Sequence, residues 1–439
     1  MNINFIREHP REVEEGAAKK NIRIDTEKIL QNDKRYRSLL QEVEKLRAEQ
    51  NALNTDVARQ SDAAQKKELI AQLSRLKEDI KKREPEMEKL RGELDRLVAE
   101  VPNLPFPHVS VGKDDTENKV LRTVGQKTVF DFASRDYMAI AEALDIIDTE
   151  RAAKVSGSRF GYLKNGGALL EIALINYVYS IVLDEGRVGR LARKIYGDDP
   201  RYAQPFAPII PPVLIKPAMM AAMGYTERGG DEIYYIPTDD LYLVGTCEQS
   251  IGPMHQGETF DEHDLPIRYI GFSSSFRREA GSYGKDTKGI LRVHQFDKLE
   301  MFSFCRPEDS VKEHQLLLAL EEEIMQGLGI PYQVIDICSG DLGDSAAQKY
   351  DIEAWVPSEN KYRETHSTSN TTDFQSERLR IKYRDRTGKT ELVHMLNGTA
   401  SAMGRMIIAI IENFQQADGS VRIPEVLQAT MRKKEITKK

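Results

Sequence analysis

The chain has 439 residues, of which 40% are hydrophobic and 30% are charged. This length exceeds one ordinary domain and is enough to build at least one large core. A formal net charge of −7 excludes a broadly basic surface, so we expect no general DNA-binding face, and any contact with RNA must be a local patch.

The cysteines and the apolar runs limit the class of protein further. An odd and sparse cysteine set without a CxxC pair argues against a disulfide framework and against a zinc site: Cys247, Cys305 and Cys338. The N-terminal segment MNINFIREHPREVEE lacks the apolar stretch of a signal peptide. The longest apolar run, residues 168–183, is too short and too polar to span a membrane. We therefore expect a cytoplasmic protein without membrane contacts.

Heptad patterns dominate the first hundred residues, after a short predicted helix and turn. Residues 26–59 carry two seven-residue series, Tyr36, Val43, Gln50 and Val57 in one and Leu39, Leu46 and Leu53 in the other. After a polar break at residues 60–65 a second helix continues the pattern, with Arg83 as its one charged seam position. Two such helices predict an antiparallel coiled coil about 50 Å long. Pro85 should disturb the second helix locally without ending it.

The charge of this predicted arm is nearly balanced. Residues 26–100 contain 17 Lys and Arg against 16 Asp and Glu, so the negative excess lies elsewhere in the chain. Sequence alone leaves two interpretations open. The arm is either a dimerisation coiled coil or a probe that grips RNA phosphates with basic residues near its tip: Arg59, Lys66, Lys67 and Arg75.

Residues 103–119 are predicted to be a proline-stiffened linker between an N-terminal domain, residues 1–102, and a body, residues 120–439. Mixed helices, alternating strands and a hairpin predict an α+β body on an antiparallel sheet flanked by helices. Residues 206–216, FAPIIPPVLIK, are predicted to form an edge strand, because proline rarely lies in a central one. The preceding residues 186–204 form either a solvated loop or a basic surface for RNA or a partner subunit: Arg187, Arg190, Arg193, Lys194 and Arg201.

Residues 272–300 carry the clearest chemical signal. Arginine, glutamate and an aromatic residue recur on two alternating runs, and a Gly-rich turn that contains lysines separates them at residues 281–289. This pattern predicts a long β-hairpin that presents Arg277, Arg278 and Arg292. Each guanidinium group can pair two phosphate oxygens at once, so the pattern indicates polyphosphate binding. The alternative is a solvated, charged hairpin.

The order of residue types in this hairpin is more specific than its charge. Phe-Arg-x-Glu-Ala-Gly, followed by Arg-Val-His-Gln-Phe-x-Lys-x-Glu, resembles the second signature motif of class II aminoacyl-tRNA synthetases, and in particular that of bacterial-type seryl-tRNA synthetases. Residues 206–216 resemble the first motif, with Pro212 as its proline, and residues 396–415 resemble the third. The predicted arm is similar to the one with which these enzymes hold the long variable arm of their tRNA.

The resemblance implies a homodimer that joins L-serine and ATP, with Mg²⁺, into seryl-adenylate and then transfers serine to tRNA(Ser). Charging of tRNA(Sec) is a second implied role where that tRNA exists. Two alternatives stay open: a related ligase that loads an amino acid onto a carrier protein, and an inactive RNA-binding regulator. The arm argues against the first alternative. The intact charged residues of the motifs argue against the second.

The resemblance also implies the residues of the nucleotide site. Arg277 would contact the α-phosphate, Arg292 the γ-phosphate and Glu279 the adenine amino group, with the adenine between Phe296 and Arg405. Hard oxygen ligands for Mg²⁺ would come from Glu364 and Ser367. The implied ATP-binding set is Arg277, Arg278, Glu279, Arg292, Val293, Phe296, Glu364, Thr365, His366, Ser367 and Arg405, in which His366 replaces the usual serine.

A second implied set would bind serine. A carboxylate can hold the ammonium group of the substrate, and a hydroxyl can orient it. The set is Thr246, Cys247, Glu248, Arg277, Glu300, Asn397 and Thr399. Cys247 has no evident base beside it, so we expect a small pocket residue and not a nucleophile. The implied catalytic residues are Arg277, Glu300 and Arg405, because the reaction needs fixed charge more than a covalent nucleophile.

Residues 261–264, Asp-Glu-His-Asp, contain metal-ligating residue types. An exposed and solvated loop is the expected structure there.

Overall fold

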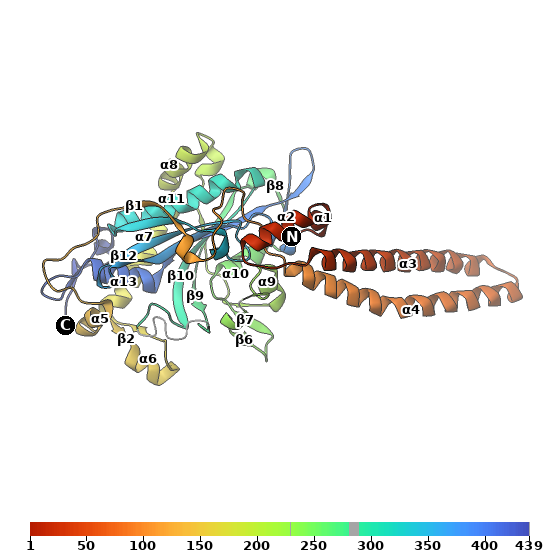
Figure 1. Cartoon of the computed structure of the whole chain (residues 1–439), viewed down its shortest axis with the longest axis horizontal. Coiled ribbons are helices and arrows are strands. Elements are labelled where there is room, and N and C mark those ends of the chain that lie inside the picture. Colours follow the sequence, from red (N-terminus) through yellow and green to blue (C-terminus); the bar gives the residue numbers. More distant parts are fainter. Residues whose placement is uncertain (229, 281–288, 439) are drawn as a thin grey trace. The chain divides into compact units, whose positions relative to one another are not determined.

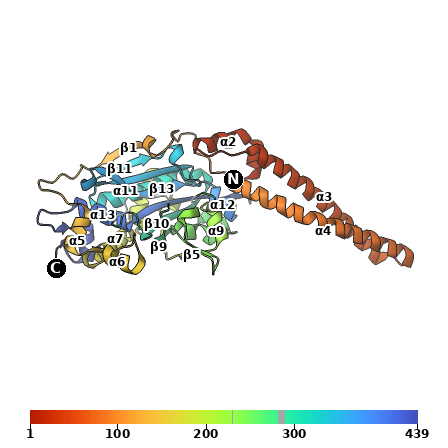
Figure 2. The same cartoon turned by 60° about the horizontal axis from the view of Figure 1, so that its bottom comes forward.

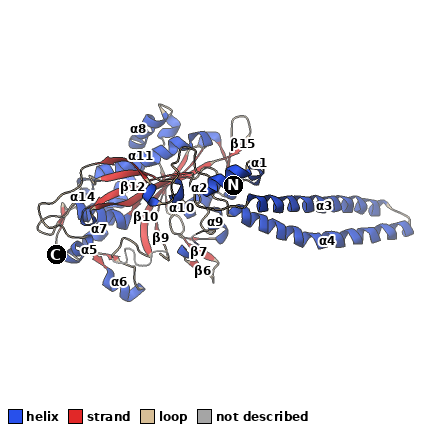
Figure 3. Ribbon diagram, viewed as in Figure 1, coloured by secondary structure: helices blue, strands red, loops and turns tan. Residues whose placement is uncertain are grey.

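The computed structural model describes residues 1–228, 230–280 and 289–438 and divides into two compact units, Met1–Pro102 and Asn103–Lys439 (Figures 1 and 3). The Gly-rich turn predicted at residues 281–289 lies outside the described residues, except for Gly289. Each unit has its own hydrophobic core.

The first unit is helical, and its two long helices form the predicted antiparallel pair. Its helices are α1 (Ile3–Glu8), α2 (Pro10–Lys19), α3 (Thr26–Arg59) and α4 (Ala63–Ala99). The break between α3 and α4 is shorter than the predicted one, because the Asp62 carboxylate accepts hydrogen bonds from the N–H groups of Ala64 and Gln65 and so caps α4. Seam residues of both helices are buried, as the heptads predict: Val43, Ile80, Leu90, Leu94 and Leu97.

Helix α4 contains the predicted interior proline and the predicted charged seam residue. Pro85 lies inside the helix without ending it, since α4 continues to Ala99. Arg83, the charged seam residue, lies 3.6 Å from Glu42 of α3, so an ion pair between the helices stands where the heptad has no apolar contact. At the base of the pair, Arg7 of α1 forms a two-pronged ion pair with the buried Asp33 of α3, at 2.8 and 2.6 Å.

The second unit is built on an eight-stranded sheet of order β1-β11-β12-β13-β16-β10-β9-β4. All neighbours are antiparallel except β4 and β9. This is the predicted α+β body. The strands are β1 (Lys119–Val124), β4 (Ala207–Ile209), β9 (Ile267–Phe276), β10 (Gln295–Cys305), β11 (Tyr332–Asp336), β12 (Gln348–Val356), β13 (Lys361–Asn370) and β16 (His394–Ala402).

Helices pack against this sheet and share one core with it (Figures 1 and 2). They are α5 (Tyr137–Leu144), α7 (Asn165–Val182), α8 (Glu185–Tyr196), α11 (Ser310–Leu328), α13 (Met403–Asn413) and α14 (Glu425–Met431). Among the described residues, α7 is the one helix whose length and composition would suit a membrane span, but half of it is buried inside the protein. It is a core helix, as its polar residues Glu171 and Asn176 indicate.

Shorter elements complete this unit. The helices are α6 (Thr149–Ser156), α9 (Pro217–Ala222), α10 (Glu248–Ile251) and α12 (Phe374–Leu379). Small sheets pair β2 with β3, β17 with β18, β5 and β6 with β7, and β8 and β15 with β14. Their bounds are β2 (Ile147–Asp148), β3 (Tyr162–Leu163), β5 (Leu214–Ile215), β6 (Tyr235–Ile236), β7 (Leu241–Leu243), β8 (Thr259–Asp261), β14 (Lys382–Arg384), β15 (Thr390–Leu392), β17 (Val421–Arg422) and β18 (Glu435–Ile436).

Residues 206–216 form two strands and not the single predicted one. The strand β4 lies at the edge of the large sheet, as predicted, whereas β5 belongs to a separate three-stranded sheet. Pro211 and Pro212 fall between them, and because proline has no N–H to donate, the ladder stops there.

Residues 186–204 are not a solvated loop. The amphipathic helix α8 buries Val188 and Leu191 and exposes its basic residues, and a 3-10 turn, Pro200–Ala203, follows it. One buried ion pair anchors this segment to the sheet: Arg268 of β9 contacts Glu313 of α11 at 2.6 and 2.8 Å. The same guanidinium donates to the backbone oxygen of Tyr202.

The segment from residue 103 to residue 118 also packs on the second unit. The Asn103 side chain donates hydrogen bonds to the backbone oxygens of Ser345 and Thr371, at 2.9 and 2.8 Å. Val109 is buried among Ile335 and Ile337. These contacts fix the segment although it contains no helix or strand longer than three residues before β1.

The Arg268–Glu313 pair generates a stability prediction. Glu313→Ala should lower the free energy of unfolding by about 3–5 kcal/mol, because it leaves Arg268 charged, buried and unpaired. Glu323→Ala is the matched control: Glu323 pairs with the exposed Arg190, and its loss should cost below about 1 kcal/mol. Denaturant unfolding followed by circular dichroism measures both. Equal losses in the two variants would contradict the anchoring role of the buried pair.

Candidate active site

Two adjoining pockets of the second unit form one cavity, whose larger part has a volume of about 820 Å³. Its lining includes residues of β10, β12, β13 and β16 of the large sheet, of α10 and α13, and of the chain that flanks residues 281–288. The charged residues of the larger part are balanced, six against six: Arg228, Arg277, Arg292, Lys298, Lys349 and Arg405 against Glu232, Glu248, Glu279, Glu300, Asp344 and Glu364.

Arg277 follows directly on β9 and has a fixed direction. Its backbone N–H donates to the His294 oxygen at 3.0 Å, which continues the pairing of the hairpin beyond the strands. Its Nε donates to the oxygen of Gly245 at 3.2 Å, and its guanidinium lies 5.3 Å from the centre of the Phe296 ring. These contacts hold a cation beside an aromatic face at the cavity wall.

Arg405 and Glu364 form a second fixed charge pair. Arg405 lies in the first turn of α13 and donates from Nη1 to the backbone oxygen of Glu364 at 3.0 Å and to its Oε1 at 3.1 Å. Desolvation in the cavity favours the protonated acid, but the nearby Arg405, Lys349 and Arg277 outweigh it and lower the pKa of Glu364 to about 2. Glu364 is therefore an anion at neutral pH.

Arg292 and Arg278, both predicted to face a polyphosphate, differ in their position relative to the cavity. Arg292 lies 3.8 Å from Glu279, and both line the cavity. Arg278 is not among the residues that line it: its guanidinium lies 6.0 Å from the Tyr234 ring, and its backbone N–H donates to the oxygen of Glu232. Phe296 and Val293, which the resemblance implies for the ATP-binding set, line the smaller part of the cavity.

The inner end of the cavity is acidic. Glu300, which is 1% exposed, lies 2.6 Å from Lys298 and accepts from the hydroxyls of Thr246 and Thr399, each at 3.4 Å. Burial raises the pKa of Glu300 to about 7; Lys298 opposes this shift, and the Glu248 charge adds to it. This carboxyl group therefore titrates close to neutral pH.

Glu248 occupies the start of α10 at the same end of the cavity. Its carboxylate accepts a hydrogen bond from the hydroxyl of Tyr225, and the neighbouring Gln249 accepts from the backbone N–H of Gly245 at 2.8 Å. Asn397 and Thr399 of β16 complete this end.

The sequence did not identify all of these residues. Lys298 could have been found, because it lies two positions before Glu300 on one strand and so shares its face. Tyr225 and Lys349 come from distant segments without a recognisable pattern.

Two predicted site residues point away from the cavity. The Cys247 thiol lies 3.5 Å from the Gly271 oxygen and packs in a second hydrophobic cluster, where burial raises the pKa of the thiol. His366 is fully buried and does not line the cavity, and burial lowers the pKa of this imidazole to about 4. A β-bulge explains the position of His366. Ile352 of β12 pairs with His366 and Glu353 pairs with Glu364, so Thr365 is an extra residue of β13 without a partner position on β12.

After this bulge the faces of β13 exchange. Ser367 and Ser369 line the cavity with Glu364, although strict alternation would separate Ser367 from Glu364. Thr365 also borders the smaller part of the cavity. Glu364 and Ser367 are thus available to a metal-bound anion, whereas His366 is not.

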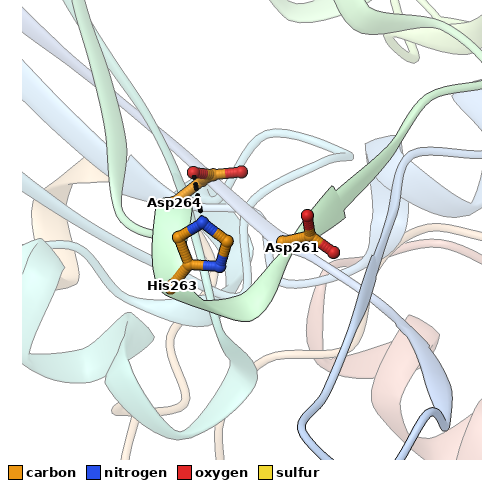
Figure 4. A group of neighbouring side chains, drawn as sticks. All are labelled: Asp261, His263 and Asp264. Carbon is orange, nitrogen blue, oxygen red and sulfur yellow. Dashed lines mark ion pairs between the residues drawn. The ribbon is translucent and has the colours of Figure 1, made fainter.

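The cluster of Asp261, His263 and Asp264 lies at the end of β8 (Figure 4). All three side chains are exposed, and His263 lies 3.3 Å from Asp264. None of them lines the cavity that contains the arginines.

Comparisons with known proteins agree with this arrangement. The family model of the seryl-tRNA synthetase N-terminal domain matches residues 1–105, and that of the class II tRNA synthetase core domain (G, H, P, S and T) matches residues 234–414. A serine--tRNA ligase of Thermobifida fusca is 46% identical over 402 residues, which cover 92% of this chain and 90% of that protein. The chain belongs to the seryl-tRNA synthetase family.

Other family members match over the full length. A serine--tRNA ligase of Dictyoglomus turgidum is 41% identical over 432 residues, which cover 98% of this chain and 97% of that protein. Among solved structures, a seryl-tRNA synthetase from Pyrococcus horikoshii complexed with ATP has a TM-score of 0.86 at 38% identity, and 100% of each chain is covered. The family has the class II fold expected from the three motifs, and both units of the present chain belong to it.

Proposed function

We propose that this chain is a serine--tRNA ligase that activates L-serine with ATP and transfers it to tRNA(Ser), and to tRNA(Sec) where that tRNA exists. The observation that carries the proposal is the single cavity in which Arg277, Arg292 and Arg405 surround one part and Glu248 and Glu300 the other. The family relationship supports the same activity over both units of the chain. A carrier-protein ligase or an inactive regulator has no observation of its own in its favour.

ATP would bind in the part of the cavity lined by Phe296 and Arg405. The adenine would lie between the Phe296 ring and the Arg405 guanidinium, with Glu279 at its amino group and Val293 and Thr365 beside it. Arg277 would contact the α-phosphate, and Arg292 the γ-phosphate. We leave Arg278 and His366 out of this set, because neither lines the cavity.

Mg²⁺ belongs to this proposal because of the charge balance. The larger part of the cavity carries equal numbers of cations and anions, so it has little net charge with which to neutralise a triphosphate. The carboxylate of Glu364 and the hydroxyl of Ser367 are hard oxygen donors of the kind that Mg²⁺ prefers. The bound ion would neutralise phosphate charge that the arginines leave. A zinc ion has no role in this proposal.

Serine would bind at the acidic inner end. Glu248 and the ionised form of Glu300 can receive the ammonium group, and Thr246, Thr399 and Asn397 can bond the hydroxyl. These donors and acceptors would lose their partner if alanine entered, so alanine is rejected. Threonine is rejected by the size of the pocket.

The reaction would have two steps. A serine carboxylate oxygen attacks the α-phosphorus of ATP, the bond to the β-phosphate breaks, and pyrophosphate leaves. A ribose hydroxyl of the tRNA then attacks the carbonyl carbon, and AMP leaves. Arg277 would stabilise the charge that develops at the α-phosphate, and Glu300 would orient the serine. No covalent enzyme intermediate is needed.

The N-terminal arm, α3 and α4, would bind the tRNA through basic residues near the turn between the two helices. A homodimer completes the proposal. Its support is a set of exposed apolar residues on α7, on β5 and beside β4: Ile172, Leu214 and Ile210, which are 52%, 40% and 85% exposed. A cytoplasmic location is also part of the proposal.

The test is serine-dependent exchange of labelled pyrophosphate into ATP, with glycine, alanine and threonine assayed in parallel, followed by charging of tRNA(Ser). Serine should give the highest kcat/KM. A higher value for another of these amino acids would contradict the pocket assignment. Exchange without tRNA charging would point to the carrier-protein ligase, and neither activity would point to the regulator.

Adjacent arginines test the phosphate contacts. Arg277→Ala should lower kcat/KM for ATP in the exchange assay by about 100-fold or more, because it removes charge from the developing anion. Arg278→Ala is the matched control with the same chemistry one residue away. Its effect should stay within about threefold, since Arg278 lies over Tyr234 outside the cavity. Similar losses in both variants would contradict this geometry.

Glu300 makes serine binding depend on pH. The raised pKa leaves much of Glu300 protonated at pH 6, and it becomes the anion that attracts ammonium as the pH rises through about 7. The kcat/KM for serine should therefore increase about tenfold or less from pH 6 to pH 8. In Glu300→Gln this rise should disappear with an overall loss of activity. A rise of the same size and midpoint in Glu300→Gln would exclude Glu300 as the titrating group.

The arm can be tested apart from the cavity. Charge reversal of Lys66 and Lys67, both exposed near the start of α4, should raise KM for tRNA in aminoacylation by tenfold or so and reduce its salt dependence. The exchange assay needs no tRNA and should be unchanged. Reversal of Lys433 and Lys434, exposed near the C-terminus, is the matched control and should alter neither assay. Equal tRNA defects in the two double variants would argue against the arm.

A further inference from the structure

One segment of the nucleotide part of the cavity is held by an element outside the three motifs. Four consecutive residues that follow Gly289 line this part: Ile290, Leu291, Arg292 and Val293. How Ile290 is fixed therefore influences where Arg292 can reach.

Three glycines make room for Ile290 and its neighbours. A Cβ atom on Gly161 would lie 2.7 Å from Cγ2 of Ile290, and one on Gly404 would lie 3.2 Å from its carbonyl oxygen. Gly289 has φ +76°, and a Cβ there would lie 1.8 Å from the hydroxyl oxygen of Tyr137. No side chain fits at that distance, so the Tyr137 hydroxyl occupies the space that Gly289 leaves open.

The Tyr137 hydroxyl also makes a directed contact. It accepts a hydrogen bond from the backbone N–H of Ile290 at 3.2 Å. Tyr137 is the first residue of α5 and lies 153 positions before Ile290 in the chain. The contact therefore fixes the end of the hairpin to a helix that contributes no lining residue to the nucleotide part of the cavity.

Helix α5 is in turn fixed to α13, beside which it lies (Figures 1 and 2). The backbone N–H of Tyr137 donates to Oε1 of the buried Glu412 at 2.9 Å. Glu412 also accepts from the backbone N–H and the hydroxyl of Ser358, at 3.1 and 2.8 Å, in the turn before β13. The Glu412 carboxylate thus connects α5 and α13, which carries Arg405, with the turn that leads into β13, which carries Glu364.

We propose that Tyr137 is a positioning residue for the nucleotide: its hydroxyl holds the backbone of Ile290, and through it Arg292 and Val293, in register with Arg405 on α13. The proposal rests on the ATP site described under the proposed function and adds to it a residue outside the three motifs. Tyr137 acts through the backbone of Ile290 and has no assigned contact with ATP itself.

Tyr137→Phe removes the hydroxyl and keeps the ring. In the serine-dependent exchange assay, KM for ATP should rise about fivefold, because the hydrogen bond that holds the backbone N–H of Ile290 is lost. KM for serine should stay close to wild type, because the residues that bind serine are retained. The melting temperature should also stay close to wild type, because the packing of the Tyr137 ring is retained. The Kd for ATP, measured by calorimetry, should rise by the same factor.

Tyr383→Phe is the matched control. The Tyr383 hydroxyl donates to Glu391 at 2.9 Å within the sheet β15-β14-β8, and neither residue lines the cavity. This variant should leave both KM values unchanged.

Gly289→Ala tests the same contact from the other side. It should weaken ATP binding more than Tyr137→Phe does, because the added methyl group meets the hydroxyl. In the double variant the loss should be smaller than the product of the two single effects, since the closest clash has been removed.

The proposal is overturned if Tyr137→Phe leaves the Kd for ATP unchanged, or if KM rises equally for ATP and serine with a fall in melting temperature. A wild-type chain that shows no serine-dependent exchange would contradict the proposed function instead. In that case the ATP calorimetry of wild type and Tyr137→Phe still decides the role of Tyr137.

Discussion

The cavity depends on cations that are held in place by nearby carboxylates. Arg405 pairs with Glu364, Arg292 with Glu279 and Lys298 with Glu300. Like charges brought this close would otherwise repel one another and the side chains would spread into solvent. The residues of these pairs lie on strands of the large sheet, next to such strands, or in the first turn of α13. The sheet and this helix therefore fix the positions of the charges.

This arrangement gives the two ends of the cavity different chemistry. The pairing lowers the pKa of Glu364, which stays anionic, whereas burial raises the pKa of Glu300 to about neutrality. The lining as a whole is balanced in charge. A triphosphate would therefore need both the arginines and a divalent cation, while an ammonium group would find its counter-charge at the inner end, in Glu248 and Glu300. The proposed order of ATP and serine in the cavity follows from this difference.

Much of this architecture could be predicted from the sequence, because its signals are periodic or ordered. The heptads gave the bounds of α3, and the alternation around Arg277 and Phe296 gave the hairpin strands. Other features had no such signal. The bulge at Thr365 inverts the faces of β13, so His366, which the resemblance placed in the ATP-binding set, faces away from the cavity. The proline pair divides one predicted strand into β4 and β5. Helix α8 packs on α11, where its Tyr196 hydroxyl donates to the buried Glu313, 117 residues away in the chain.

Long-range contacts explain the remaining omissions in the site. Tyr225 reaches Glu248 and Tyr137 reaches Ile290 only after the chain has folded, and neither tyrosine belongs to a recognisable motif. Cys247 shows the opposite case: its neighbours Thr246 and Glu248 line the cavity, but its own side chain turns into the hydrophobic cluster around Phe302. Position within a motif therefore identified segments that line the cavity. It predicted the direction of individual side chains only in part.

A crystal structure of the chain with a non-hydrolysable seryl-adenylate analogue would show where the adenine, the phosphate and the serine bind. We predict the adenine between Phe296 and Arg405, the phosphate substitute within hydrogen-bond distance of Arg277, and the serine ammonium group at Glu248 and Glu300. An analogue bound with its phosphate substitute remote from Arg277, or with its amino group away from both carboxylates, would contradict the account.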